Sequence, residues 1–267
     1  MKTYFVDSFT NKVFKGNPAG VCLLTESLSE IQMLNVAKEI GFSETAFVKS
    51  LTKENRYSIR FFSPKQEIPL CGHATLAAAK ILFTTTDATT ATFENVNGVA
   101  LTVTKSGQQL AMRFPIYETK PTSVPSTMLE ALGLQSVVAS SYCENTKMII
   151  LEIDSAKTLL NLQPDFGALV KSYEGADGVL VTAASDNADF DFHYRYFWPW
   201  AGTNEDPVTG VVHTFLTKYW SQRLHKKTLK AFQSSERTGF MTAELHDDHV
   251  MIYGTAVIVL EGTFLSY

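Results

Sequence analysis

Two ionisable side chains, Cys71 and Asp206, occupy equivalent places in two similar stretches of this sequence. The pentapeptide RFFSP begins at Arg60 and RYFWP begins at Arg195, 135 residues later; Cys71 and Asp206 stand seven residues beyond the two prolines. Each is followed by small residues, CGHAT or DPVTG, and then by an apolar segment with helical character. A thiol and a carboxylate at two helix starts could act as nucleophile, acid or base.

The shared offset of pentapeptide and loop predicts that the chain contains two similar halves. Coincidence is the alternative, but it explains a match of five residues better than a match that extends into the next loop. Reactive groups at both helix starts suggest an active site between the halves. Strand-like runs surround one apolar helical segment in each half, so we expect an α+β architecture of two pseudo-symmetric lobes, each a curled sheet or barrel around a central helix.

The elements that must position these residues follow from periodicity and from turn residues. A helix is expected after Ser27 or Ser29 and should end at Gly41. The segment from Gly72 or His73 to residue 83 is apolar on nearly every side, which predicts an enclosed helix. A second long helix is expected over 207–223, because proline is tolerated in the first helical turn.

Domain boundaries are expected at the turn-rich segment KPTSVP, residues 120–125, which has the composition of a linker. We expect an N-terminal lobe over 1–118 and a C-terminal lobe over 119–255. The last strand, within 256–267, is expected to return to the first lobe and complete it.

Composition narrows the class of protein. The chain has 267 residues, a net charge of −4 and 45% hydrophobic residues. No basic stripe is present, so a nucleic-acid partner is not expected. No apolar run reaches membrane-spanning length and the N-terminus lacks the apolar core of a signal peptide, so we expect no membrane association. Three cysteines without CxxC spacing fit a reducing, cytoplasmic location.

Four motifs in order resemble the PhzF-like family, named for an isomerase of phenazine biosynthesis. They are DSFTNKVFKGNPAGVCLL near the start, GFSETAFV at 41–48, IRFFSPKQEIPLCGHATLAAA at 59–79 and NEDPVTG at 204–210. The set covers most of the chain, and its order and spacing are specific, although NPAG or DPVTG alone would be weak. The resemblance implies the diaminopimelate epimerase-like fold of two pseudo-symmetric lobes, in agreement with the internal repeat.

The resemblance also implies site residues. Glu44 matches the family's acid/base, and His73 and Asp206 match its polar partners. From the residues alone, Glu44 could be a solvated carboxylate at a strand start, His73 a core histidine and Asp206 a helix N-cap. In the racemase relatives two cysteines face each other, whereas here Cys71 stands at the first position and Asp206 at the second. For Cys71 the residues favour a small packed thiol over a nucleophile or base.

The ligand-binding residues are expected at the two helix starts, where free N–H groups suit a carboxylate. The family usually reads DPVTGSA, and here two valines replace Ser-Ala, so a hydroxyl expected beside the substrate is missing. Asn17, in GNPAG, could bind the ligand or simply form a turn. Histidines are scattered and no metal or nucleotide motif occurs, so neither metal nor cofactor is expected. The expected substrate-binding residues are Asn17, Cys71, Gly72, Thr209, Gly210 and Val211.

The function implied is a cofactor-independent isomerase of PhzF type that shifts a proton on a small cyclic or amino-acid-derived carboxylate in the cleft between the lobes. A homodimer is the expected assembly. Two alternatives stay open. A racemase or epimerase would need acid/base groups on opposite faces of a stereocentre, and the Cys–Cys pair is absent. A non-catalytic ligand-binding or interaction protein is suggested by Val211, but the presence of Glu44, His73 and Asp206 together argues against it.

Overall fold

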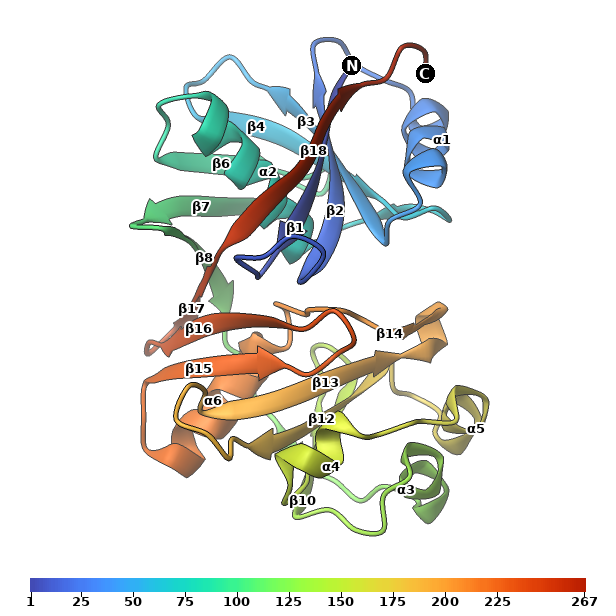
Figure 1. Cartoon of the computed structure of the whole chain (residues 1–267). Coiled ribbons are helices and arrows are strands. Elements are labelled where there is room, and N and C mark those ends of the chain that lie inside the picture. Colours follow the sequence, from blue (N-terminus) through green and yellow to red (C-terminus); the bar gives the residue numbers. More distant parts are fainter. The chain divides into compact units, whose positions relative to one another are not determined.

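The computed structural model describes residues 1–267 and divides the chain into two compact units (Figure 1). The first comprises Met1–Arg113 together with Met251–Tyr267, and the second comprises Phe114–Val250. The C-terminal strand β18 (Ala256–Thr263) therefore belongs to the first unit, where it pairs antiparallel with β1 (Lys2–Ser8).

The first unit is one curled sheet with two helices. Its strands are hydrogen-bonded in the order β18–β1–β2–β3–β4–β6–β7–β8, and the short β5 pairs with β4. The pairs β2–β3 and β4–β6 are parallel and need crossover segments, which α1 and α2 supply. The remaining bounds are β2 (Asn17–Leu24), α1 (Glu30–Ile40), β3 (Glu44–Ser50), β4 (Arg56–Phe62), β5 (Glu67–Ile68), α2 (Gly72–Thr85), β6 (Thr90–Glu94), β7 (Ala100–Ser106) and β8 (Gln109–Pro115).

Helix α1 begins and ends where the sequence predicts. Ser29 and Gln32 form a capping box, in which each side chain accepts a hydrogen bond from the other's backbone N–H. At the other end Gly41 adopts a left-handed conformation, with φ of 74°, and its N–H donates to the Ala37 carbonyl. The capping prediction is confirmed, and Gly41 turns the chain directly into β3.

Helix α2 is enclosed by its own sheet, as its apolar sequence predicts. Residues from His73 to Ala79 are all buried, and the helix packs against β1, β2, β3, β6, β7 and β18. The start of α2 lies beside the end of β1 and the start of β3, where His73 contacts Ser8 and Glu44. The longest helix of the structure has 14 residues, and no helix combines the length and the apolar character that a bilayer crossing requires.

The second unit repeats this plan. Its strands pair in the order β9–β10–β11–β12–β13–β15–β16, and the short β14 pairs with β13. The bounds are β9 (Lys120–Pro121), α3 (Ser126–Leu132), β10 (Ala139–Cys143), β11 (Met148–Glu152), α4 (Ala156–Leu160), α5 (Phe166–Ser172), β12 (Gly178–Ala184), β13 (Phe192–Trp198), a 3₁₀ turn at Pro199–Ala201, β14 (Thr203–Glu205), α6 (His213–Leu224), β15 (Thr228–Gln233), β16 (Gly239–Leu245) and, running past the unit's end, β17 (His249–Gly254).

The pairing pattern confirms the internal duplication. In both units an antiparallel pair is followed by parallel, antiparallel, parallel and antiparallel pairs, and a buried helix occupies the second crossover. The fold is therefore α+β, with two pseudo-symmetric lobes that each curl around a central helix.

Three local expectations need correction. The segment 120–125 is not simply a linker, since Lys120 and Pro121 form β9 and pair with β10. Asn17, for which a turn was one interpretation, is the first residue of strand β2, because its backbone pairs with Ser8 in the ladder with β1. The second long helix, expected over 207–223, begins only at His213.

Candidate active site

Glu44 is the first residue of β3 and is buried, with 8% of its surface exposed. Gly41 ends α1 three residues earlier, and the parallel register places Glu44 beside Ala19 of β2. Its Oε2 lies 3.3 Å from Nε2 of His73. A solvated carboxylate at a strand start was one interpretation of the sequence, and the burial of Glu44 rules it out.

His73 lies in the first turn of α2, also buried. Burial lowers its pKa, and the charge of Glu44 and a hydrogen bond to the Pro18 carbonyl oppose that shift in part. Desolvation is the largest of these effects, so the neutral ring of His73 is favoured. The hydroxyl of Ser8 donates to the His73 carbonyl at 2.8 Å and ties the helix start to β1.

Cys71 precedes the helix as its N-cap residue, and its thiol makes no capping hydrogen bond. The Sγ atom lies 3.4 Å from Nδ1 and 3.9 Å from Nε2 of His73. The Cys71 carbonyl accepts two hydrogen bonds from Thr75, one from its N–H and one from its hydroxyl, which hold the backbone in place. Gly72 lies between Cys71 and His73 in the sequence. The fold thus brings together Glu44, Cys71 and His73, which come from two separate elements.

Asn17 is fully buried at the start of β2, opposite Ser8 in the ladder with β1. It directly precedes Pro18, whose carbonyl meets the His73 ring. The preceding Gly16 has φ of +70°, and a Cβ there would lie 2.2 Å from the Ser8 carbonyl oxygen, so only glycine fits at this turn.

In the second unit Asp206 lies in the loop between β14 and α6, seven residues before His213, the first residue of the helix. The alternative interpretation of Asp206 as a helix N-cap is excluded, because the N-cap of α6 is Val212. Instead the Asp206 carboxylate accepts the Thr209 hydroxyl. Helix α6 starts later than predicted because side chains from other elements hydrogen-bond the backbone of this loop.

Three side chains hold that loop. Gln233 accepts the N–H of Thr209 at 2.7 Å and donates to the Asp206 carbonyl at 2.6 Å. Tyr194 donates to the Thr209 carbonyl, and Ser235 donates to the Pro207 carbonyl. In this conformation the Thr209 N–H is engaged with Gln233 and is not offered to an anion. Gly210 accepts from the N–H of His213, and Val211, 36% exposed, stands at the turn into the helix.

Sequence reasoning missed a buried polar chain behind this loop. His213 Nε2 lies 3.3 Å from the Tyr194 hydroxyl, and its Nδ1 lies 3.3 Å from the Thr217 hydroxyl. Burial lowers the pKa of His213 to about 3 and raises that of Tyr194, so both side chains stay neutral. The pattern that could have found them is the i, i+4 spacing of His213 and Thr217 on one face of a helix.

The repeated pentapeptides serve a structural purpose. Arg60 of β4 makes two hydrogen bonds to Glu67 of β5, at 2.7 and 2.6 Å, and Arg195 of β13 makes two to Glu205 of β14, both at 2.7 Å. Each guanidinium also lies over the ring two residues further on, that of Phe62 or Phe197. Each fork anchors the short strand that leads into the loop with Cys71 or Asp206.

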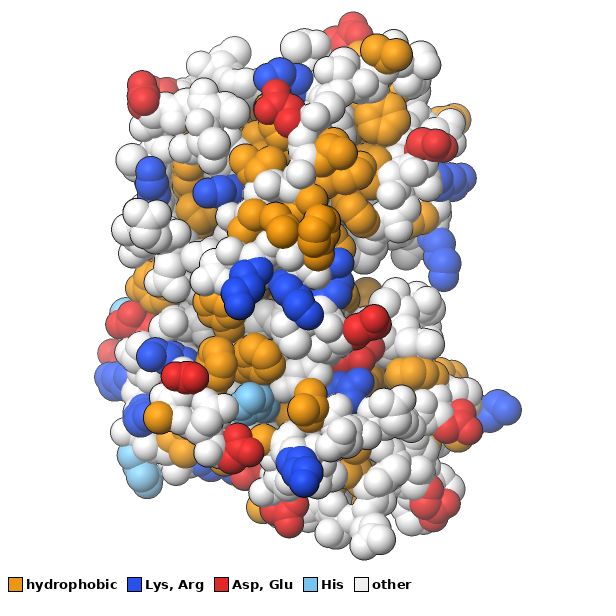
Figure 2. All heavy atoms as spheres, in the orientation of Figure 1, with side chains coloured by type: hydrophobic (Ala, Val, Ile, Leu, Met, Phe, Trp, Pro, Cys, Tyr) orange, Lys and Arg blue, Asp and Glu red, His pale blue; other side chains and the backbone are white.

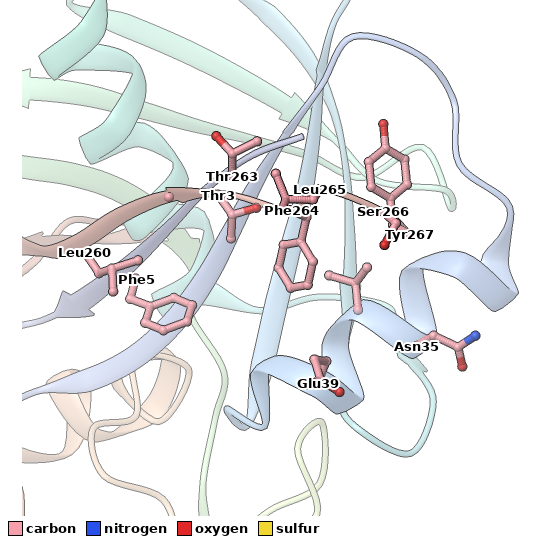
Figure 3. A pocket seen from close by; sticks show the side chains of 12 residues that line it. Thr3, Phe5, Asn35, Glu39, Leu260, Thr263, Phe264, Leu265, Ser266 and Tyr267 are labelled. Carbon is pink, nitrogen blue, oxygen red and sulfur yellow. The ribbon is translucent and has the colours of Figure 1, made fainter.

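A separate hollow of about 610 Å³ lies in the first unit beside α1 (Figure 3). Its walls come from α1, β1 and the C-terminal end, including Phe5, Glu39 and Phe264. Figure 2 shows hydrophobic side chains gathered on the face where Figure 1 draws β1 and β18, and Leu260 and Leu265 are exposed in that region. The ionisable side chains in its walls are those of Glu39 and Tyr267, and no histidine or cysteine lines it, so the hollow offers no carboxylate–imidazole pair.

The fold and the site define an epimerase-like α+β protein with a buried carboxylate–imidazole pair in its first unit. The sequence profile described as phenazine biosynthesis-like protein, PhzC–PhzF, matches residues 6–262. An uncharacterized isomerase of Halalkalibacterium halodurans is 40% identical over 266 residues, which cover 98% of this chain and 97% of that protein. The chain therefore belongs to the PhzC–PhzF family and is an isomerase-type enzyme.

Solved structures agree with this assignment. A PhzF family protein of Enterococcus faecalis superposes with a TM-score of 0.92 at 37% identity, covering 99% of both chains. A predicted epimerase of Pseudomonas aeruginosa superposes with a TM-score of 0.74 at 18% identity, covering 100% of this chain and 99% of that one, which shows a shared fold.

Proposed function

We propose that this chain is a cofactor- and metal-independent isomerase that shifts a proton on a small cyclic or amino-acid-derived carboxylate, with Glu44 as the group that takes and returns the proton. The observation that carries the proposal is the buried contact between Glu44 and His73, at 3.3 Å. A carboxyl group beside an imidazole can pass a proton back and forth near neutral pH.

The proposed roles follow from the contacts. His73 orients the Glu44 carboxyl group and can exchange a proton with it. The Pro18 carbonyl and the Ser8 hydroxyl hold the ring and its backbone, which keeps the distance to Glu44 constant during the reaction. Asp206, matched to the family motif, is proposed to contact the substrate with Thr209 held against it.

A proton shift on one face is favoured over racemisation by the placement of the acid/base groups. A carboxylate oxygen of Glu44, the sulfur of Cys71 and a ring nitrogen of His73 all lie within 4.8 Å of one another. Groups this close approach a substrate from one side, whereas inversion of a stereocentre needs an acid and a base on opposite sides. Cys71 beside His73 therefore adds a thiol to the same face and does not supply the second base of a racemase.

The proposal is tested by hydrogen exchange. Dialysed protein is incubated in D₂O with a panel of cyclic and amino-acid-derived acids, and deuterium incorporation and product formation are followed by NMR. We expect exchange at a carbon position together with an isomeric product, unaffected by a chelator. Loss of activity with the chelator and recovery with added metal would contradict metal independence. Tight binding of an acid without any exchange would support the non-catalytic alternative.

A further inference from the structure

The first unit holds three different metal-binding donor atoms in one buried cluster. A carboxylate oxygen of Glu44, the thiol of Cys71 and a ring nitrogen of His73 all lie within 4.8 Å of one another. Glu44 Oε2 is 3.3 Å from His73 Nε2, and Cys71 Sγ is 3.9 Å from the same nitrogen. The thiol is closer to the other ring nitrogen, with Cys71 Sγ 3.4 Å from His73 Nδ1, so the carboxylate lies beside Nε2 and the thiol lies towards Nδ1.

These separations approach those of ligands around one tetrahedral ion. With zinc bonds of about 2.3 Å to sulfur and about 2.0–2.2 Å to nitrogen and oxygen, neighbouring donors stand roughly 3.3–3.6 Å apart. The Glu44–His73 distance already has this value, and the Cys71–His73 distance exceeds it by a few tenths of an ångström. To share an ion with Glu44 at Nε2, the Cys71 side chain has to rotate from the Nδ1 side of the ring towards Nε2.

The surroundings also suit a metal ligand. The Pro18 carbonyl accepts a hydrogen bond from the His73 ring, the kind of outer partner that orients a ligating histidine. The Cys71 backbone is held by Thr75, so the rotation of its side chain alone sets where the thiol lies.

We propose that Glu44, Cys71 and His73 form a binding site for one Zn²⁺ ion, with the fourth position left to water. A mixed sulfur, nitrogen and oxygen set favours zinc over magnesium or calcium, which take oxygen ligands. Binding forms the Zn–S bond as the thiol proton leaves to solvent. If Glu44 acts as proposed above, the ion occupies its reactive oxygen and inhibits the isomerase reversibly; this consequence rests on the proposed function, whereas binding itself does not.

A surface site must be distinguished in the test. The rings of His246 and His249 stack with centroids 4.4 Å apart, next to Asp248, and surface imidazoles also bind zinc. Neither Cys22 nor Cys143 belongs to the donor cluster, so a metal–thiolate bond reports on Cys71 alone.

The experiment titrates the metal-free, reduced full-length protein with Co²⁺, which gives a thiolate-to-metal charge-transfer absorption, and then displaces it with Zn²⁺. We expect one equivalent to produce the band, the band to be unchanged in Cys143→Ser and His249→Ala, and both the band and tight binding to be lost in Cys71→Ser. Loss of a second-shell partner alone weakens metal binding about 10–100-fold, so loss of this ligand should weaken Zn²⁺ binding by more than about 100-fold.

Glu44→Gln and Cys71→Ala provide second variants, with circular dichroism to confirm folding, and both should weaken Zn²⁺ binding. A titration without a thiolate band, or equal Zn²⁺ affinity in wild type and Cys71→Ser, would overturn the site. A protein that binds Zn²⁺ as described but exchanges no substrate hydrogen would leave the metal site intact and count against the proposed function alone.

Discussion

The two arginine forks allow one prediction to be worked from an internal comparison. In Arg195→Ala the chain loses both bonds to Glu205 and those to the carbonyls of Leu159 and Leu162. The Arg195 and Glu205 side chains are only 10% and 17% exposed. Removing one partner of a buried ion pair costs about 3–5 kcal/mol, because the other charge is left without compensation.

The matched variant is Arg60→Ala. Arg60 makes the same fork to Glu67, but its side chain is 28% exposed and none of its hydrogen bonds goes to a backbone carbonyl. A more solvated pair of this kind contributes about 1 kcal/mol. The difference in exposure therefore predicts a several-fold larger loss of stability for Arg195→Ala than for Arg60→Ala.

Differential scanning calorimetry measures both variants against wild type. At roughly 2–4 °C per kcal/mol for a chain of this size, Tm should fall by about 6–20 °C in Arg195→Ala and by about 2–4 °C in Arg60→Ala. Arg195→Lys keeps the charge but not the fork and should lie between wild type and Arg195→Ala. Equal losses at the two positions would refute the burial argument.

Three further predictions concern single residues. The pKa of His213 is about 3 when folded and about 6.5 when unfolded, so the unfolded chain takes up the proton first as pH falls. Denaturant unfolding should therefore show about 2 kcal/mol less stability at pH 5 than at pH 6.5 from this group. His213→Gln should remove this part of the dependence of stability on pH. Gly178→Ala should destabilise by about 1–3 kcal/mol in the same assay, because its Cβ would lie 2.5 Å from the buried Tyr196 hydroxyl, whereas Gly167→Ala, at an ordinary 3.4 Å contact in α5, should be neutral or stabilising. Val211→Ser should increase turnover of a phenazine-pathway type of acid if the valine retunes the pocket, and unchanged inactivity with tight binding of another ligand would favour the non-catalytic alternative.

Much of the architecture could be predicted, because capping residues and hydrophobic patterns in the local sequence mark where the elements begin, end and become buried. Ser29 and Gly41 bound α1, and the apolar sequence of α2 requires enclosure on all sides. The offset of the two pentapeptides reflects two copies of one arginine fork, so the repeat in sequence is a repeat of strand pairing.

The late start of α6 could not be predicted from local sequence. Pro207 suggests a first helical turn, where proline is tolerated. However, Gln233, 24 residues beyond Thr209, binds the loop backbone and keeps it out of the helix. The polar chain of His213 and Tyr194 likewise depends on a contact between helix and strand.

The candidate site was only partly visible in the sequence. Only the family resemblance indicates Glu44 and His73 as site residues. Nothing in the local sequence shows that a strand start and a helix start 29 residues apart place these two side chains 3.3 Å from each other. The sequence does not reveal the donor cluster for the same reason, because Glu44 belongs to a different element from Cys71 and His73.

The most direct measurement of the central claim is substrate hydrogen exchange in D₂O by Glu44→Gln, which keeps the size of the side chain and removes the base. Loss of a positioned acid/base costs roughly 10²–10⁴-fold in rate, so exchange should fall by at least 100-fold while ligand affinity and fold are retained. Glu39→Gln, at an exposed carboxylate of α1, is the matched control and should exchange at the wild-type rate. A Glu44→Gln protein that exchanges the substrate hydrogen as fast as wild type would contradict the assignment of Glu44 as the proton-transfer group.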